Sequence, residues 1–131
     1  AVGSVKLFKS YKPDFLDGEQ LRDFIYVMDV VRIMIELADP DKASASGIYN
    51  VGTGKARSFL DLTKATFKAM EVPPRIEFIE MPEQLRGQYQ YFTEADTKKL
   101  LATLPGFTFS SLEESIMDYV QNYLMKKNPH C

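Results

Sequence analysis

The chain carries apolar residues at helical spacing in three stretches, separated by loops and short apolar runs. The first lies between Asp29 and about Ala38, where apolar positions recur every three or four residues and predict a helix capped by Asp29. The second begins at Ser58 and ends before Pro73, and the third begins at Ser111. Ser58 and Ser111 are each followed three residues later by a carboxylate, which is the spacing of a capping box. Both serines therefore predict helix starts.

Short runs of aromatic and β-branched residues predict strands between these helices. Thr93 and Asp96 repeat the capping spacing and predict a further short helix to about Leu101. Because strands and helices alternate, the chain is predicted to be an α/β domain. The aliphatic run Ile48–Val51 is typical of a strand that is buried on both faces of a parallel sheet. The predicted strands are Val5–Phe8, Asp23–Val27, Ile48–Val51 and Arg75–Ile79.

The composition is that of an ordinary globular chain, with 45% apolar and 26% charged residues among 131. The 16 basic and 18 acidic residues give a net charge of −2, which disfavours a general nucleic-acid binder, because such proteins need a basic surface. The longest apolar stretch, near Val30–Leu37, is far shorter than the roughly 20 residues that a membrane span needs. We therefore expect neither a nucleic-acid nor a membrane partner. The single cysteine fits a reduced, cytoplasmic setting.

Histidine and cysteine are almost absent from the chain. The single histidine is His130 and the single cysteine is Cys131, both at the C-terminal end. A serine–histidine–aspartate triad, a cysteine–histidine pair and a zinc site all need more of these residues, or need them within ordered structure. No metal site and no internal disulfide is therefore expected. The chemistry that remains is that of tyrosine, arginine, lysine, serine and carboxylates.

Two partial motifs of nicotinamide-dependent enzymes occur in the chain. Gly52 and Gly54 lie between a predicted strand and a predicted helix, but Arg57 stands where the dinucleotide fingerprint has its third glycine. We interpret this segment as a tight strand-to-helix turn. Tyr123 and Lys127 have the Tyr-x-x-x-Lys spacing of short-chain dehydrogenases, but they end the last predicted helix, where catalytic geometry could not be held. Neither motif is taken as an active site.

A longer combination of motifs resembles a known family. The segment Arg22–Val30 has the sequence RDFIYVMDV, and Ile48–Gly54 follows with IYNVGTG. In this order and spacing they resemble the C-terminal half of extended short-chain dehydrogenases/reductases, which include nucleotide-sugar epimerases and dehydratases. Two further segments, Val5–Tyr11 and Arg86–Asp96, resemble the ADP-heptose 6-epimerase branch of this family. The chain is therefore expected to be the C-terminal, substrate-binding part of an extended Rossmann-fold enzyme.

The resemblance implies a reaction that this stretch of sequence does not complete by itself. The parent enzyme would bind NADP or NAD in an N-terminal Rossmann domain, oxidise C6 of the heptose in ADP-heptose, and return the hydride to the opposite face. The glycine-rich loop and the catalytic tyrosine and lysines would belong to that domain, so no catalytic or cofactor-binding residue is expected here. Two alternatives stay open: the same portion of another nucleotide-sugar epimerase or dehydratase, and a non-catalytic module that binds nucleotide sugars.

Substrate-binding positions can be named from the same resemblance. A guanidinium donates paired hydrogen bonds to phosphate oxygens, and aromatic rings stack on a base. From the residues alone, the alternative for Arg22 is a surface ion pair with Asp23, Asp17 or Glu19. The candidate contacts are Phe8, Lys9, Ser10 and Tyr11 for the nucleotide, Arg22 and Arg86 for the phosphates, and Tyr89 for the substrate.

The resemblance also divides the chain between two parts of the parent fold. Residues 29–52 are expected to pack on the N-terminal Rossmann domain, residues 1–28 and 53–125 to form the substrate subdomain, and residues 126–131 to fray. Apolar surface would then be exposed where the Rossmann domain packs. The resemblance further suggests a homo-oligomer, such as a pentamer.

Overall fold

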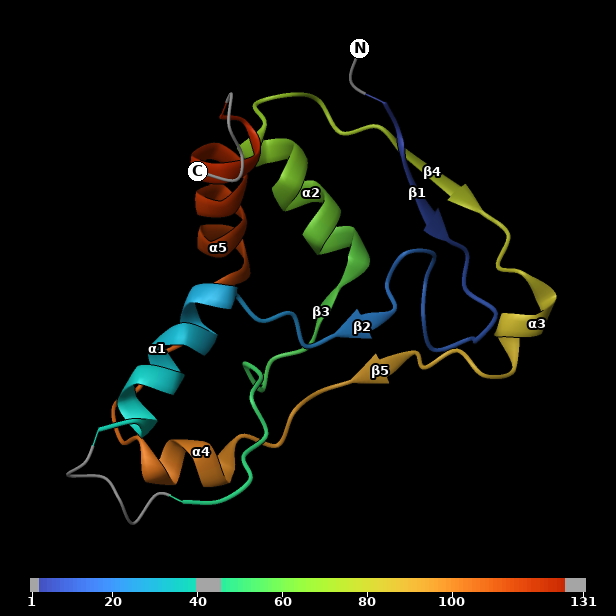
Figure 1. Cartoon of the computed structure of the whole chain (residues 1–131). Helices are drawn as coiled ribbons and strands as arrows, with labels where there is room; N and C mark the ends of the chain where they lie inside the picture. The colour runs from blue at the N-terminus through green and yellow to red at the C-terminus, as the bar shows by residue number, and fades with distance from the viewer. Residues whose placement is uncertain (1–2, 40–45, 127–131) are drawn as a thin grey trace.

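The computed structural model describes residues 3–39 and 46–126, which form short strands and helices (Figure 1). No helix in these ranges is both long and apolar enough to cross a membrane. The strands are β1 (Val5–Phe8), β2 (Leu21–Arg22), β3 (Arg57–Ser58), β4 (Ile76–Ile79) and β5 (Phe92–Thr93). The helices are α1 (Val27–Leu37), α2 (Phe59–Ala69), α3 (Glu83–Arg86), α4 (Lys98–Thr103) and α5 (Leu112–Tyr119), which continues into the π-helix η2 (Val120–Leu124).

Helices α2 and α5 lie side by side and share one apolar core (Figure 1). Each begins at a serine that caps it. The Ser58 hydroxyl accepts from the Asp61 amide while the Asp61 carboxylate accepts from the Ser58 amide, and Ser111 and Glu114 repeat the arrangement. Both predicted capping boxes are confirmed. The buried residues of this core are Ala65, Ala69, Ile116 and Val120.

The strands form two small sheets. β1 pairs with β4 in parallel, and Phe8 faces Ile79 at the end of this register. β2 is the middle strand of the other sheet, antiparallel to β3 and parallel to β5. The α/β class is confirmed, and both sheets contain a parallel pair. The predicted strand Asp23–Val27 is wrong, because β2 ends at Arg22 and α1 already begins at Val27.

Helix α1 begins earlier than its sequence predicts. Tyr26 is the N-cap and Asp29 lies within the first turn, so the predicted Asp29 cap is wrong. The buried Asp29 carboxylate accepts from the Ser110 amide at 2.8 Å and the Ser110 hydroxyl at 3.0 Å, and Arg32 pairs with it at 3.0 Å. A buried carboxylate needs such partners, and here they tie α1 to the segment before α5. The core beneath α1 is formed by Ile33, Leu100 and Leu104.

Two further predicted boundaries differ from the structure. Residues 48–51 form no strand, and Ile48 is 90% exposed. A strand needs a neighbour for its backbone hydrogen bonds, and no strand in the described ranges pairs with this segment. Helix α4 begins at Lys98, so the predicted start at Thr93 is also wrong. Thr93 ends β5 instead, and Asp96 accepts from the Lys98 amide at 3.1 Å.

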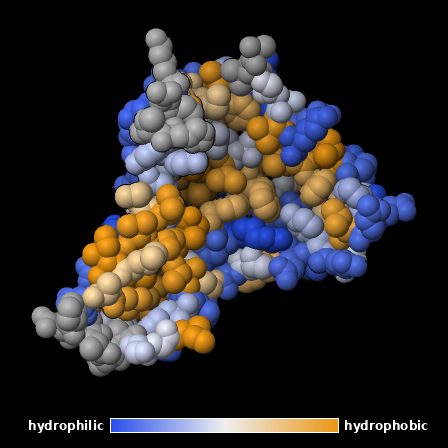
Figure 2. Space-filling view, in the orientation of Figure 1, coloured by the Kyte–Doolittle hydropathy of each residue, from blue (hydrophilic) through white to orange (hydrophobic). Residues whose placement is uncertain are grey.

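The outward face of α1 is apolar and exposed. It forms most of the hydrophobic patch in the lower left of Figure 2. The inner face of the same helix packs on α4, so α1 is apolar on opposite sides, which is typical of a helix buried on both. The exposed residues of this face, here called the α1 face, are Val27, Met28, Val31, Met34 and Ile35.

The C-terminal motif is only partly described by the structure. Tyr123 lies in η2 and stacks on Tyr119, with 5.9 Å between ring centroids. Its predicted partner Lys127 lies outside the described residues, as do His130, Cys131 and all of the tail predicted to fray except its first residue.

The Ser111 cap can be tested by mutation. Ser111→Ala removes the hydroxyl that accepts from the Glu114 amide, and we expect it to lower the free energy of unfolding by about 1 kcal/mol. Urea denaturation measures this change. The control is Ser115→Ala in the same helix, where alanine favours the helical state, so stability is unchanged or slightly higher. Equal losses in the two variants would contradict the capping role.

Candidate functional site

Arg22 ends β2 with aromatic rings on two sides. Its guanidinium carbon is 5.3 Å from the ring centroid of Tyr89 and 5.8 Å from that of Phe59. Phe8, at the end of β1, meets Tyr89 edge-on with 6.1 Å between centroids. We call these four residues the Arg22 cluster. The structure thus brings together three of the predicted contacts, Phe8, Arg22 and Tyr89, from distant parts of the sequence.

Arg22 has no carboxylate partner among the described residues. Its Nη1 donates to the Leu21 carbonyl at 2.7 Å. The aspartates considered as partners are engaged elsewhere, since Asp17 accepts from the Ser10 amide at 2.7 Å and Asp23 accepts from the loop after residue 52. The surface ion pair considered for Arg22 is therefore not formed. Its remaining N–H groups can donate to an anion from outside the chain.

Glu80 gathers three of the other predicted contacts. Its carboxylate accepts from the Lys9 Nζ at 2.7 Å and from the Tyr11 hydroxyl, and the Arg86 Nη2 lies 3.9 Å away. The Arg86 guanidinium also covers the Tyr11 ring, 3.9 Å from its centroid. We call these four residues the Glu80 cluster. The hydrogen bond from Lys9 holds the pKa of Glu80 below its usual range, and Glu80 in turn raises the pKa of Lys9. Unlike Arg22, both cations of this cluster therefore face a carboxylate.

Glu80 was not among the residues predicted from the sequence. The pairing of β1 with β4 would have placed it beside Lys9. Phe8 faces Ile79 in the parallel register of β1 and β4, so Lys9 and Glu80 are the next residues along the two chains. Ser10 follows Lys9 and is held within its own loop, because its hydroxyl donates to a backbone carbonyl two residues on at 3.0 Å. The structure gives Ser10 a role in loop geometry.

Two buried side chains that were not predicted fix the loop between β1 and β2. The Tyr91 hydroxyl accepts from the Tyr11 amide at 2.9 Å. Gln20 donates its Nε2 to the carbonyls of Phe8 and Lys9, both at 3.3 Å. Both side chains are almost fully buried, so these bonds are shielded from competing water. They set where the predicted nucleotide contacts lie.

The Gly52–Gly54 turn encloses a carboxylate of this chain. Asp23 Oδ1 accepts from the Thr53 amide at 2.8 Å and the Thr53 hydroxyl at 2.5 Å. Its Oδ2 accepts from the Gly54 amide at 2.9 Å and the Ala95 amide at 3.1 Å. Successive backbone N–H groups of this kind make a concavity for an anion. Because Asp23 already fills it, these amides are not free to hold the phosphates of a dinucleotide.

The surroundings of Asp23 favour its charged form. Partial burial pushes the pKa of Asp23 upward, but hydrogen bonds from Thr53, Ala95 and Gly54 outweigh burial and hold the pKa below its usual range. Close packing adds a steric requirement at Gly52. A Cβ on Gly52 would lie 2.5 Å from the Ala95 Cβ and 2.6 Å from Asp23 Oδ2. Only glycine fits there without a shift of its neighbours.

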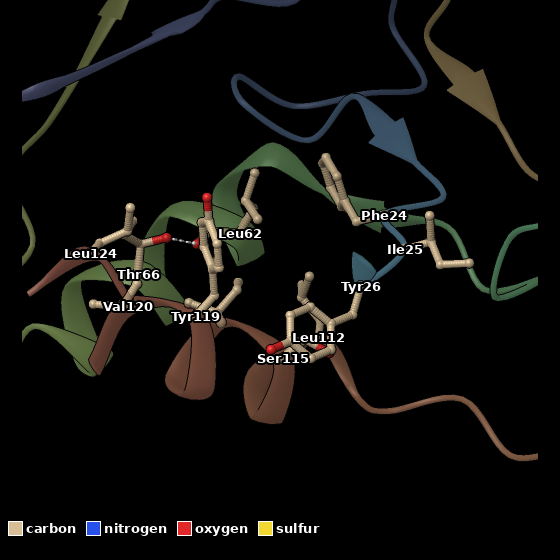
Figure 3. Close-up of a pocket in the computed structure, with 11 residues that line it drawn as sticks. Phe24, Ile25, Tyr26, Leu62, Thr66, Leu112, Ser115, Tyr119, Val120 and Leu124 are labelled. Atoms are coloured by element: carbon tan, nitrogen blue, oxygen red, sulfur yellow. Dashed lines mark hydrogen bonds between the residues drawn. The ribbon is translucent and has the colours of Figure 1, made fainter. Parts of the chain in front are cut away.

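An apolar cleft of about 370 Å³ lies between α2 and α5, at the segment that leads into α1 (Figure 3). Tyr26 at its edge donates to Asp118, and burial together with this carboxylate raises the pKa of Tyr26. The phenol therefore stays protonated at neutral pH. None of the residues that line the cleft is charged, so it does not offer a pyrophosphate a cation. This cleft therefore does not compete with the Arg22 cluster as a candidate anion site.

The sequence of this chain is similar to a family model and to several known proteins. The model of the NAD dependent epimerase/dehydratase family matches residues 3–52. ADP-L-glycero-D-manno-heptose-6-epimerase of Fusobacterium nucleatum is 54% identical over 98% of this chain and 40% of its own length. The enzyme of the same name from Nitratidesulfovibrio vulgaris (strain Hildenborough) is 48% identical over 98% of this chain and 39% of its own. The chain is homologous to a portion of the ADP-heptose 6-epimerases. It spans about 40% of the length of these curated relatives.

Several solved structures share the fold of this chain. ADP-L-glycero-D-manno-heptose-6-epimerase of Helicobacter pylori superposes with a TM-score of 0.65 and 29% identity, over 91% of this chain and 32% of that one. MoeE5, solved with UDP-glucose and NAD, has a TM-score of 0.62 and 28% identity over 86% of this chain and 34% of its own. UDP-glucose-4-epimerase of Stenotrophomonas maltophila, at 24% identity and a TM-score of 0.70 over 88% of this chain and 33% of its own, shares the fold. The fold is that of part of an extended short-chain dehydrogenase/reductase, as the motifs predicted.

The glycine requirement of the turn around Asp23 can be measured. Gly52→Ala places a methyl group against Ala95 and Asp23, and overpacking of this kind lowers the free energy of unfolding by about 1–3 kcal/mol. Chemical denaturation provides the measurement. Gly87→Ala is the matched control, because nothing lies within 4 Å of a Cβ at Gly87, and we expect no loss of stability there. If Gly52→Ala were as stable as Gly87→Ala, the close packing would be disproved.

Proposed function

We propose that this chain is the nucleotide-sugar-binding portion of an ADP-heptose 6-epimerase. Such an enzyme interconverts ADP-D-glycero-D-manno-heptose and ADP-L-glycero-D-manno-heptose for the lipopolysaccharide core. The observation that carries the proposal is Arg22, a cation without a carboxylate partner in the described chain, held beside the rings of Tyr89 and Phe59. Phe8 meets the Tyr89 ring edge-on. The relatives named for this activity match nearly the whole of this chain at 48–54% identity, which supports the choice of substrate.

The Arg22 cluster suits a sugar nucleotide in its chemistry. The pyrophosphate of ADP-heptose carries about two negative charges, and a planar guanidinium can donate two parallel hydrogen bonds to its oxygens. Hydrogen bonds to charged groups contribute roughly 1.5–3 kcal/mol each, which is enough to select for the phosphates. The rings of Phe8 and Tyr89 provide apolar faces beside the charge, where a base or a sugar can pack. Arg22 would hold the phosphates, and the rings would orient the groups attached to them.

The Glu80 cluster would act differently from the Arg22 cluster. Lys9 and Arg86 share one carboxylate, so part of their charge is already neutralised before a ligand arrives. Tyr11 is bound to the same carboxylate and covered by Arg86. We propose that these residues and Ser10 shape the loop beside the nucleotide, with Arg86 as the secondary phosphate contact.

The nicotinamide cofactor of the parent enzyme, NADP or NAD, would bind outside this portion. The one turn here that resembles a dinucleotide fingerprint has its amides occupied by Asp23, so the residues do not fit a pyrophosphate. Among the described residues, no group of three histidine, cysteine, aspartate or glutamate side chains is arranged to hold a metal ion. We therefore assign substrate binding to this chain, and hydride transfer to a Rossmann domain that would share the cytoplasmic enzyme with it.

The α1 face would pack on that Rossmann domain. Met34 and Ile35 are about two-thirds exposed, and Ile48, in the segment predicted as a strand, is 90% exposed. Large apolar surfaces of this kind are typical of a contact with another domain or chain. A neighbouring sheet edge would also supply the paired strand that residues 48–51 do not have in the described structure. This is the division that the sequence predicts for residues 29–52, and a homo-oligomer of the complete enzyme is compatible with it.

The role of Arg22 can be tested by calorimetry on the protein expressed from its complete coding sequence. Arg22→Ala removes the paired hydrogen bonds to the pyrophosphate, and we expect ADP-heptose to bind about 10–100-fold more weakly. Lys64→Ala, which removes one exposed positive charge from α2, should leave the affinity unchanged. An unchanged affinity in Arg22→Ala would refute the phosphate contact.

The same measurement separates the alternatives for the substrate. Tighter binding of ADP-heptose than of UDP-glucose supports the 6-epimerase, and the reverse order supports another nucleotide-sugar epimerase or dehydratase. Binding without interconversion of the two ADP-heptoses, in protein from the complete coding sequence, supports a non-catalytic module.

The role of the α1 face as a contact surface can be tested by mutation. Ile35→Glu replaces an apolar side chain that is 68% exposed, and we expect it to reduce self-association of the isolated chain in sedimentation velocity. Leu16→Glu is the matched control, because Leu16 is 69% exposed but lies in the loop between β1 and β2. Equal effects of the two substitutions would show that the α1 face is not a specific contact surface.

A further inference from the structure

We infer that Asp23 is the positioning residue for Arg22, a role that rests on the function proposed above. Asp23 directly follows the arginine in the chain and does not itself belong to the Arg22 cluster. Its carboxylate joins three segments, namely the end of β2, the turn at Thr53 and Gly54, and the residue Ala95 beyond β5. These contacts would fix the backbone from which the guanidinium projects.

The backbone ladder of strand β2 ends at Arg22. The strand has two residues, and its last backbone pairings are Arg22 with Arg57 on one side and Arg22 with Thr93 on the other. At the next residue the Asp23 side chain takes over from the backbone. Oδ1 accepts on the side of β3, and Oδ2 accepts on both sides. One carboxylate therefore extends the three-stranded sheet past the end of its middle strand.

The four hydrogen bonds require an ionised carboxylate. All four neighbours are donors, and a carboxylate accepts at both of its oxygens. In an asparagine, one oxygen is replaced by an NH₂ group that can only donate. This NH₂ group would face backbone N–H donors, so at least one of the hydrogen bonds that link Asp23 to its neighbouring segments would be lost. Asparagine has nearly the same size as aspartate, but it could not accept all four of these hydrogen bonds.

The hydrogen bonds of Asp23 matter for binding because the Arg22 guanidinium must be in place before the ligand arrives. Arg22 has no ion pair in the described chain that could orient it, and its contacts are the two rings and one backbone carbonyl. A long side chain on a loose backbone would lose conformational entropy on binding, and a fixed backbone reduces that cost. Asp23 would thus raise the affinity for phosphates without touching them.

The test measures binding of ADP and of adenosine by calorimetry, with the protein expressed from its complete coding sequence. Asp23→Asn should weaken ADP by about tenfold, as loss of one charge-assisted contact would, and should leave adenosine unchanged. In an Arg22→Ala background the same substitution should have no further effect on ADP, because the residue it positions is gone. Asp96→Asn is the control, because it removes the same charge from an exposed side chain next to Ala95.

The outcomes separate this inference from the proposed function. If Arg22→Ala binds ADP normally, both fail. If Arg22→Ala weakens ADP but Asp23→Asn does not, only the inference fails. Equal weakening of ADP and adenosine by Asp23→Asn would show a merely structural role and overturn it. Thr53→Val serves if Asp23→Asn does not fold, since it removes one donor to Oδ1, keeps the backbone donors, and should weaken ADP alone by about threefold.

Discussion

A single carboxylate, that of Asp23, connects the parts of this chain that are far apart in sequence. It accepts from Thr53 and Gly54, which lie 30 and 31 residues further along the chain, and from Ala95, which lies 72 residues further along. The backbone ladder of β2 ends at Arg22, and beyond that residue the Asp23 side chain links β2 to the segments before β3 and after β5. The same carboxylate occupies the amides of the Gly52–Gly54 turn, so they are not free to bind a phosphate.

How far the sequence predicted the structure depends on how local each signal was. The capping boxes at Ser58 and Ser111 were confirmed, because a cap is made within four residues and needs no distant partner. The Asp29 cap and the strand at Asp23–Val27 were wrong, because each aspartate found distant donors, in Ser110 and in the Thr53 turn. The predicted strand at residues 48–51 is not formed, since a strand requires a neighbour and the described chain has none to offer it.

The candidate site was also predicted only as far as its signals are local in the sequence. Residue types and motifs led to Arg22, Phe8 and Tyr89, which the structure brings together. They could not show that Lys9, Tyr11 and Arg86 converge on Glu80, because that depends on the register of β1 against β4. Residue types and motifs also could not show that, within the described chain, Arg86 lies near a carboxylate while Arg22 does not. Two arginines of similar appearance in the sequence differ in the structure, because only one of them has a carboxylate nearby.

The Asp23–Thr53 hydrogen bond joins residues that are 30 positions apart. The described chain leaves the sheet just after Asp23, forms α1, and at Thr53 returns to the same carboxylate. The described residues of this stretch therefore begin and end at one carboxylate, that of the residue next to Arg22. A protein surface that contacts α1 would therefore bind a segment whose two ends meet at the residue next to Arg22. The proposed domain contact and the proposed phosphate contact would then lie on segments that meet at Asp23.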